Sequence, residues 1–138
     1  MRILGLDPGS KRVGVAISDE LQMIAQPVEF IPAEPFEDLG KRIVQFVDEQ
    51  GVEMIIVGMP RNMDGGYGPA AEKSKVFIEK LRGVVSVPIR SWDERLTSAQ
   101  ANRVLIDGNV SRAKRKEKVD KMAAAILLQS FLDAQSCQ

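Results

Sequence analysis

The sequence contains no histidine, and this absence narrows the chemistry available to it. Without histidine there is no Ser-His or Cys-His catalytic pair and no histidine-ligated zinc. The single cysteine, Cys137, excludes a disulfide framework and indicates a reducing compartment. If the chain is an enzyme, its ionisable groups are carboxylates, lysines, arginines, one tyrosine and one cysteine.

Net charge and hydropathy exclude further classes. The formal net charge is zero, so only a local basic patch, and not the molecule as a whole, could attract nucleic acid. The longest apolar run, MAAAILL, is too short to span a bilayer. The N-terminal MRILGLDPG lacks the long apolar segment of a secretory signal. We therefore expect a cytoplasmic protein that does not associate with membranes.

The pattern of apolar residues predicts one α/β domain over residues 1–138, with a mixed sheet. Three short apolar runs separated by turns predict an antiparallel meander, after which helices and strands alternate. The expected strands are residues 3–6, 13–17, 28–31, 53–60 and 84–92. The expected helices are residues 36–50, 69–81, 97–107 and a last helix from about 119. The buried stripe expected in that last helix is Val119, Met122, Ala123, Ile126, Leu127 and Phe131.

Three acids occupy positions where a structural role does not require them. Asp7 closes the first strand, the pair Asp93–Glu94 closes the fifth, and Asp120 is expected in the first turn of the last helix. Neighbouring strand tips and a helix packed across the sheet could bring these acids together. Mg²⁺ takes oxygen ligands and uses few protein carboxylates, so this set suits a phosphodiesterase with one or two metal ions.

Each acid also has a structural explanation. An aspartate before Pro-Gly commonly forms a turn. An acid in a first helical turn is favoured by the helix dipole. Asp93–Glu94 could be solvated or paired with Arg95. Only the joint placement of the three acids at the ends of elements favours a metal site.

Two glycine-rich segments and one basic segment are candidates for contact with nucleic acid. Lys11 and Arg12 follow the turn in DPGSKRVGVA, which lacks the Walker A and dinucleotide-binding spacings. PRNMDGGYG is either a flexible connection or a substrate loop that uses Arg61 and Asn62. In RAKRKEK, which is expected to lead into the last helix, the charges are either only solvated or hold a polyanion near Asp120. The candidate contact residues in that segment are Lys114, Arg115 and Lys116.

Four segments, in order, resemble the YqgF/RuvX family, also described as Holliday-junction-resolvase-like proteins or pre-16S rRNA nucleases. They are GLDPGSKRVGVA, IIVGMPRNMDGGYG, DERLTSAQA and KVDKMAAAILL, and the match in which they occur extends over nearly the whole chain. The resemblance implies a ribonuclease H-like fold, with a mixed five-stranded sheet flanked by helices and the first strand between the second and fourth. It also implies that Asp7, Glu94 and Asp120 are the catalytic, metal-binding acids.

The resemblance implies a hydrolase dependent on Mg²⁺ or Mn²⁺ that processes the 5′ end of precursor 16S rRNA, free or bound in the ribosome. The alternative is a Holliday-junction resolvase that cuts branched DNA. A monomer or a homodimer is expected, with branched DNA favouring the dimer. RuvC-type resolvases carry a further acid at the end of the fourth strand, which MIIVGMP lacks. Glu117, three residues before Asp120, is a candidate for a fourth metal ligand.

Two other classes remain open at the level of the sequence. DPGSKRVGVA resembles the first phosphate loop of sugar kinases and actin-like ATPases, but those proteins close two lobes around their nucleotide. This chain has residues for only one such lobe. A non-catalytic binding module with the same fold would show no magnesium-dependent cleavage.

Overall fold

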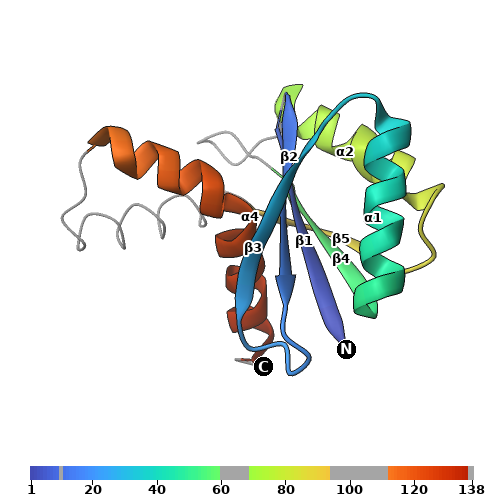
Figure 1. The fold of residues 1–138 in the computed structure, drawn as a ribbon, viewed down its shortest axis with the longest axis horizontal. Helices are drawn as coiled ribbons and strands as arrows, with labels where there is room; N and C mark the ends of the chain where they lie inside the picture. Colours follow the sequence, from blue (N-terminus) through green and yellow to red (C-terminus); the bar gives the residue numbers. More distant parts are fainter. Residues whose placement is uncertain (10, 60–68, 94–111, 137–138) are drawn as a thin grey trace.

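A mixed sheet between two layers of helices organises the part of the chain that the structure describes (Figure 1). In this computed structural model the described residues are 1–9, 11–59, 69–93 and 112–136, without the side chains of 69–71, 93, 112–121 and 136. The strands are β1 (Arg2–Pro8), β2 (Arg12–Ser18), β3 (Ala25–Pro32), β4 (Val52–Met59) and β5 (Ile89–Asp93). The helices are α1 (Phe36–Gln50), α2 (Pro69–Arg82) and α4 (Arg112–Ser136). The helix expected over 97–107 lies outside the described residues.

The five described strands lie in the order β3-β2-β1-β4-β5. The first three pair antiparallel, and β4 and β5 run parallel to β1. This order confirms the expected antiparallel meander and the central place of the first strand between the second and fourth. The fifth strand lies at an edge. Because β1, β4 and β5 point the same way, their carboxyl ends lie at one edge of the sheet.

The two faces of the sheet are covered by different helices (Figure 1). Leu4 and Leu6 of β1 belong to a core cluster with residues of α1 and α2. Ile3 belongs to a second cluster with residues of α4. The alternation along β1 follows from the period of two residues in a strand, so odd-numbered residues of β1 face α4.

Helix α1 forms where the sequence predicts it. Glu37 and Asp38 lie in its first turn, where negative charge favours the partly positive helix start. Gly51 ends the helix in the left-handed conformation, with φ 66°, and its N–H donates a hydrogen bond to the Val47 carbonyl. The buried residues are Leu39, Gly40, Ile43 and Phe46.

Helix α4 differs from the prediction at its start. It begins at Arg112 and therefore contains the whole basic segment, which was expected only to lead into it. Arginine, lysine, alanine and glutamate are strong helix formers, so a segment rich in them favours a helix although it is highly charged. Asp120 consequently lies about two turns inside α4 and not in its first turn. Its expected position against unpaired backbone N–H groups is wrong.

The buried face of α4 also differs from the predicted stripe. Met122 is 37% exposed, and Ala123 and Ile126 are only half-buried, whereas Leu127 and Phe131 are buried as expected. The buried residues of α4 are Ala124, Ala125, Leu127, Leu128, Phe131 and Leu132. The helix is thus turned so that two alanines meet the sheet.

The reason for this turn is a close approach of α4 to β1. A Cβ atom built at Gly5 would lie 2.9 Å from the Leu128 Cβ and 3.3 Å from the Ala124 carbonyl oxygen. Only glycine leaves enough room on the strand for this approach. The Trp92 indole N–H of β5 donates a hydrogen bond to the Ser130 hydroxyl at 3.1 Å, and this bond connects α4 to the edge strand β5.

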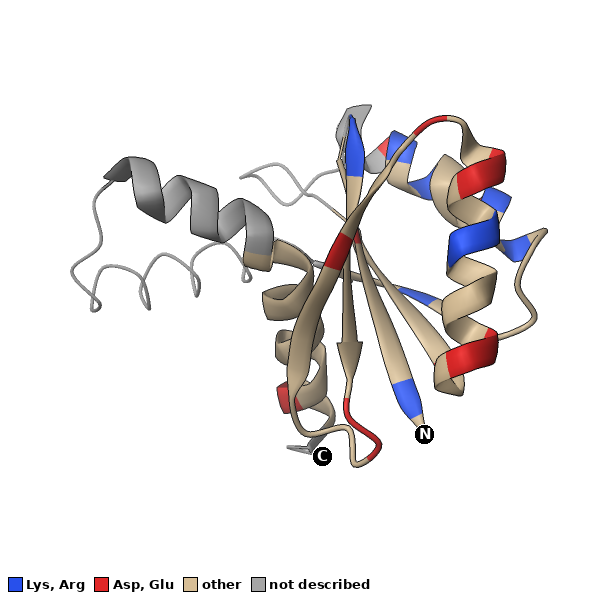
Figure 2. Cartoon of the chain, in the orientation of Figure 1, with Lys and Arg blue, Asp and Glu red and all other residues tan. Residues whose placement is uncertain are grey.

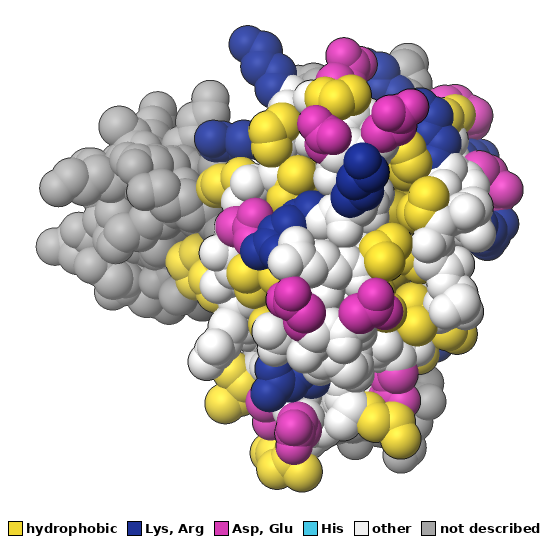
Figure 3. Space-filling model, turned by 45° about the vertical axis from the view of Figure 1, so that its right-hand side comes forward, with side chains coloured by type: hydrophobic (Ala, Val, Ile, Leu, Met, Phe, Trp, Pro, Cys, Tyr) yellow, Lys and Arg dark blue, Asp and Glu magenta, His cyan; other side chains and the backbone are white. Residues whose placement is uncertain are grey.

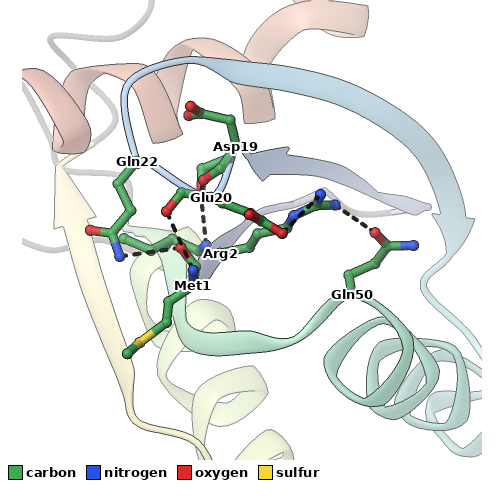
Figure 4. Close-up of polar contacts among 8 residues, drawn as sticks. Met1, Arg2, Asp19, Glu20, Gln22 and Gln50 are labelled. Carbon is green, nitrogen blue, oxygen red and sulfur yellow. Dashed lines mark hydrogen bonds and ion pairs between the residues drawn. The ribbon is translucent and has the colours of Figure 1, made fainter.

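The N-terminus and the β2–β3 turn lie at the end of the sheet where β1 begins, opposite the carboxyl end of β1 (Figure 4). The Asp19 carboxylate accepts hydrogen bonds from the backbone N–H groups of Met23 at 2.7 Å and Ile24 at 2.9 Å. The N–H groups of Ile24 and Met23 hold the pKa of Asp19 below its ordinary value. The Arg2 guanidinium donates to the Gln50 side chain at 2.7 Å and thereby links β1 to the end of α1.

None of the helices in the described part of the chain combines the length and the hydropathy that a membrane span requires.

We expect Gly5→Ala to destabilise the protein by about 1–3 kcal/mol, because the added methyl group would collide with Leu128 and force α4 away from β1. The free energy of unfolding in urea measures this loss. The matched control is Gly40→Ala in α1, whose added Cβ would lie 3.6 Å from the nearest atom. It should leave stability unchanged or raise it by about 0.5–1 kcal/mol. Equal effects of the two variants would contradict the close approach at Gly5.

Candidate active site

Asp7 ends the apolar run of β1 and lies half-buried on the α4 face of the sheet. In the antiparallel pairing of β1 and β2 it stands opposite Gly14. In the parallel pairings, Leu6 is in register with Val57 of β4, and Val57 is in register with Ser91 of β5. The end of β5 therefore lies near the level of Asp7, two strands away.

A cleft of about 670 Å³ opens beside Asp7. Its other lining residues come from the β1–β2 turn and from β2 and β3; they are Gly9, Lys11, Arg12, Gly14, Phe30 and Pro32. The Gly9 N–H donates to the Arg12 carbonyl at 2.9 Å, and this tight turn returns the chain from β1 into β2. As a result, two basic residues lie in the same cleft as the carboxylate.

Gly14 has no side chain, and three other residues surround the position that its side chain would occupy. A Cβ atom built there would lie 3.7 Å from the Asp7 Cβ, 3.5 Å from the Phe30 ring and 3.5 Å from the Ala124 Cβ. Three segments distant in sequence therefore meet at this point: the end of β1, the middle of β3, and α4. Gly14 forms the floor of the cleft between Asp7 and Phe30.

The basic residues of the cleft are exposed. Lys11 and Arg12 both reach solvent, and the Arg12 guanidinium carbon lies 4.1 Å from the centroid of the Phe30 ring. Figure 2 shows these charges at the start of β2, at the same end of the sheet as the carboxyl end of β1. An anionic ligand that enters the cleft would meet two cations before it meets the carboxylate.

The Asp7 carboxylate forms no hydrogen bond or ion pair with any other described residue. A half-buried carboxylate is stabilised by a hydrogen-bond donor or a cation, because its desolvation is otherwise costly. Within the described ranges there is no group of three metal-ligating side chains. Asp7 and the open cleft beside it fit a hard divalent ion, which takes oxygen ligands and keeps several waters.

The other predicted site residues are only partly described. Glu94, Arg61 and Asn62 lie outside the described residues. The basic segment with Lys114, Arg115 and Lys116, and also Glu117, belongs to α4, of which only the backbone is described there. Asp120 likewise lies in α4, four residues and about one helical turn before Ala124. Since the Ala124 Cβ reaches the position above Gly14, α4 passes close to Asp7.

The structure adds two residues to the site that the sequence did not single out, Gly14 and Phe30. Phe30 pairs with Gly14 in the β2–β3 ladder, and Gly14 pairs with Asp7, so the three share one row across the sheet. No periodicity in the sequence distinguishes Phe30, because its neighbours Pro27 and Val28 are also apolar and yet exposed. Only the strand register places its ring beside the carboxylate.

A second cleft, of about 830 Å³, lies on the other face of the sheet. It is lined mainly by residues of α1, α2 and the segment before α1, with Lys73 and Lys80 as its cations and Glu34 as its carboxylate. The surface that comes forward in Figure 3 carries basic and acidic side chains interspersed. That mixture of signs gives this surface no strong attraction for a polyanion.

Comparison with known proteins shows a consistent relationship over the chain. The family model described as "RuvX: Holliday junction resolvase" matches residues 1–134. A protein of Halothermothrix orenii is 53% identical over 137 residues, covering 99% of this chain and 97% of that protein. A protein of Geobacillus kaustophilus is 52% identical over 136 residues, covering 97% and 99%. Both relatives carry the name "Putative pre-16S rRNA nuclease".

Solved structures show the same fold at low sequence identity. RuvC of T. thermophilus, in complex with a Holliday junction substrate, superposes with a TM-score of 0.63 and 15% identity, covering 100% of this chain and 97% of that one. The fowlpox virus Holliday junction resolvase superposes with a TM-score of 0.54 and 15% identity, covering 97% and 99%. These likenesses confirm the ribonuclease H-like fold.

We expect Gly14→Ala to fold normally but to lower the rate of nucleic-acid cleavage by about tenfold to 100-fold. The added methyl group makes ordinary contacts, so stability should change little, but it fills the floor between Asp7 and Phe30 and displaces a bound phosphate. Initial cleavage rates and thermal unfolding, measured on the same preparation, separate the two effects. Full activity would show that the substrate does not occupy this floor.

Proposed function

The chain belongs to the RuvX family of Holliday junction resolvases, and from this premise we propose that it is a metal-dependent nuclease that processes the 5′ end of precursor 16S rRNA. The names of relatives about half identical to it over nearly their whole length support this substrate. The observation that carries the nuclease activity is Asp7: a half-buried carboxylate at the carboxyl end of the central strand, without a described partner, in a cleft with two cations. The substrate implies a cytoplasmic protein that takes part in ribosome biogenesis.

In this proposal Asp7, Glu94 and Asp120 hold Mg²⁺ or Mn²⁺. Glu94 directly follows β5, whose carboxyl end shares a sheet edge with that of β1. Asp120 lies one turn before Ala124, the point where α4 meets the row of Asp7 and Gly14. A divalent ion bound by these acids would activate a water molecule and stabilise the leaving oxygen of a phosphodiester. The sequence contains no histidine that could serve as the general base.

The cations around the cleft bind the substrate backbone in this proposal. Lys11 and Arg12 line the cleft and are exposed, so their charges can pair with phosphates on either side of the cleaved bond. We further propose that Lys114, Arg115 and Lys116 of α4, and Arg61 and Asn62 between β4 and α2, supply additional contacts to the substrate. Because the net charge of the chain is zero, affinity depends on this local set.

Cleavage of branched DNA is the second candidate, and the description of the matching family favours it. The two candidates separate in one experiment. The protein is incubated with ribosome-bound precursor rRNA and with a mobile four-way DNA junction, each in Mg²⁺ and in Mn²⁺. Cleavage near the mature 5′ end of the rRNA, without symmetrical cuts in the junction, supports the rRNA nuclease. The reverse result supports the resolvase, and a native mass measurement then tests for the homodimer that a two-fold junction favours.

We expect Asp7→Asn to abolish cleavage and to leave the fold intact, since the amide keeps the shape of the side chain but removes its charge. The second readout is metal binding without turnover: Mn²⁺ should raise the melting temperature of the wild-type protein and not that of the variant. Asp19→Asn is the matched control, because that carboxylate lies at the other end of the sheet. Cleavage by Asp7→Asn at the rate of this control would refute the metal site.

We expect the triple variant Lys114→Ala, Arg115→Ala, Lys116→Ala to bind the substrate more weakly and with a flatter dependence on salt. Each lost phosphate contact should reduce the slope of log affinity against log salt by roughly 0.7 to 0.9. The control removes the same number of charges from α1 and α2, at the exposed residues Lys41, Lys75 and Arg82. If both triple variants show the slope of the wild-type protein, the basic segment of α4 is only a solvated surface.

A further inference from the structure

We propose that Arg12, whose guanidinium lies over the ring of Phe30, is a stacking platform for one unpaired nucleobase next to the phosphate at Asp7. This inference rests on the proposed nuclease function and adds a requirement to it: the substrate must present a single-stranded nucleotide at the cleft. The base contact is made by the guanidinium, and Phe30 is a positioning residue that acts through Arg12.

The geometry of the platform follows from strand register. Asp7, Gly14 and Phe30 are cross-strand neighbours on β1, β2 and β3, all on the face covered by α4. Neighbouring strands lie about 4.8 Å apart, so Phe30 stands about 10 Å from Asp7 along the row. Gly14 contributes no side chain between them, and the three residues line one continuous cleft.

Arg12 lies beside this row, two residues before Gly14 on β2. It begins β2 and pairs with Pro32, two residues beyond Phe30 on β3, so its side chain lies on the same face of the sheet. The guanidinium carbon is 4.1 Å from the Phe30 centroid, which is the distance of a cation stacked on a ring. Arg12 is exposed and Phe30 is half-buried, so a ligand can reach the arginine from solvent while the ring contacts it.

A guanidinium can stack on a base as well as pair with a phosphate. Its planar group stacks on aromatic faces, and nucleobases stack on arginine planes in single-stranded recognition. The contact with the ring restrains the guanidinium before the ligand arrives, so less side-chain entropy is lost when a base stacks on it. Lys11, the neighbouring cation of the cleft, has no planar group, and it supplies charge without a stacking surface.

The platform has a consequence for the choice of substrate. A base within a duplex is already stacked and paired, and it reaches a platform on the protein only after it is unstacked, which costs a few kcal/mol. A nucleotide in a single-stranded tail, a bulge or an opened junction avoids this cost. We therefore expect the cleaved bond to lie beside an unpaired nucleotide, whether the strand is RNA or DNA.

The test is an abasic scan around a mapped cleavage site. A nucleic acid that the wild-type protein cuts at one position is prepared with a single abasic nucleotide placed in turn at each position near the cut. Affinity is measured in Ca²⁺ in place of Mg²⁺, with a gel to verify that the strand stays intact. In the wild-type protein one position should weaken binding by roughly fivefold to 100-fold, which is the contribution of one stacked base.

Arg12→Lys should remove this dependence on one base while the salt slope of binding stays unchanged, because lysine keeps the charge and loses the plane. Phe30→Leu should remove it as well, and Phe30→Trp, which keeps an aromatic face, should retain it. The matched control is Phe36→Leu. Phe36 also carries a cation, with the Lys80 ammonium 5.4 Å from its centroid, but it lies with α1 and α2 on the other face of the sheet.

The outcomes distinguish the platform from the proposed function. If the wild-type protein cuts its substrate but binds every abasic version equally, the platform is refuted and the nuclease stands. The platform is also refuted if Arg12→Lys keeps the full dependence on one base; because Arg12 is exposed, this variant should fold normally. If no nucleic acid is cut or bound at all, the proposed function itself fails.

Discussion

The contact between α4 and the two central strands is the constraint on which the site depends. Gly5 leaves no room for a Cβ atom beneath Leu128, and Gly14 leaves an open position beside Ala124. Small residues on both sides let the helix axis approach the sheet more closely than large residues would permit. This approach fixes α4 next to the carboxyl end of β1, where Asp7 stands. A carboxylate on a strand and one on a helix can share a metal ion only if such a contact holds the two elements at a fixed distance.

The two faces of the sheet have different tasks. The face toward α1 and α2 holds the larger core cluster, with Leu4 and Leu6 of β1 fully buried. The face toward α4 is apolar near the start of β1 and becomes polar at its end, where the cleft opens. Because residues alternate along a strand, one strand contributes to both the core and the site. Asp7 is therefore supplied by a strand and not by a loop. A rigid central strand holds a ligand more precisely than a loop would.

The sequence predicted most elements of the fold, and its errors have physical causes. The positions of the first four strands and the bounds of α1 followed from local patterns, because each depends on neighbouring residues only, whereas the fifth strand begins at Ile89 and not at residue 84. The predicted start of α4 is too late, because the dense run of lysine and arginine before residue 119 favours a helix and belongs to it. The buried stripe of α4 was shifted because the helix has apolar residues on more than one side. Which side is buried depends on glycines far away in β1 and β2.

By itself the sequence determined the class of chemistry, the family and the candidate acids. The absence of histidine and the DERLT and VDKMAAAILL segments are local facts that need no coordinates. The tertiary structure alone decided that Asp7, Gly14 and Phe30 form one row and that Arg12 lies on the Phe30 ring. The physical reason is strand register: a shift of one residue in β3 would turn Phe30 to the other face, and no local pattern fixes that shift. Neighbours across a sheet are set by the pairing of whole strands, which the residues on a single strand do not encode.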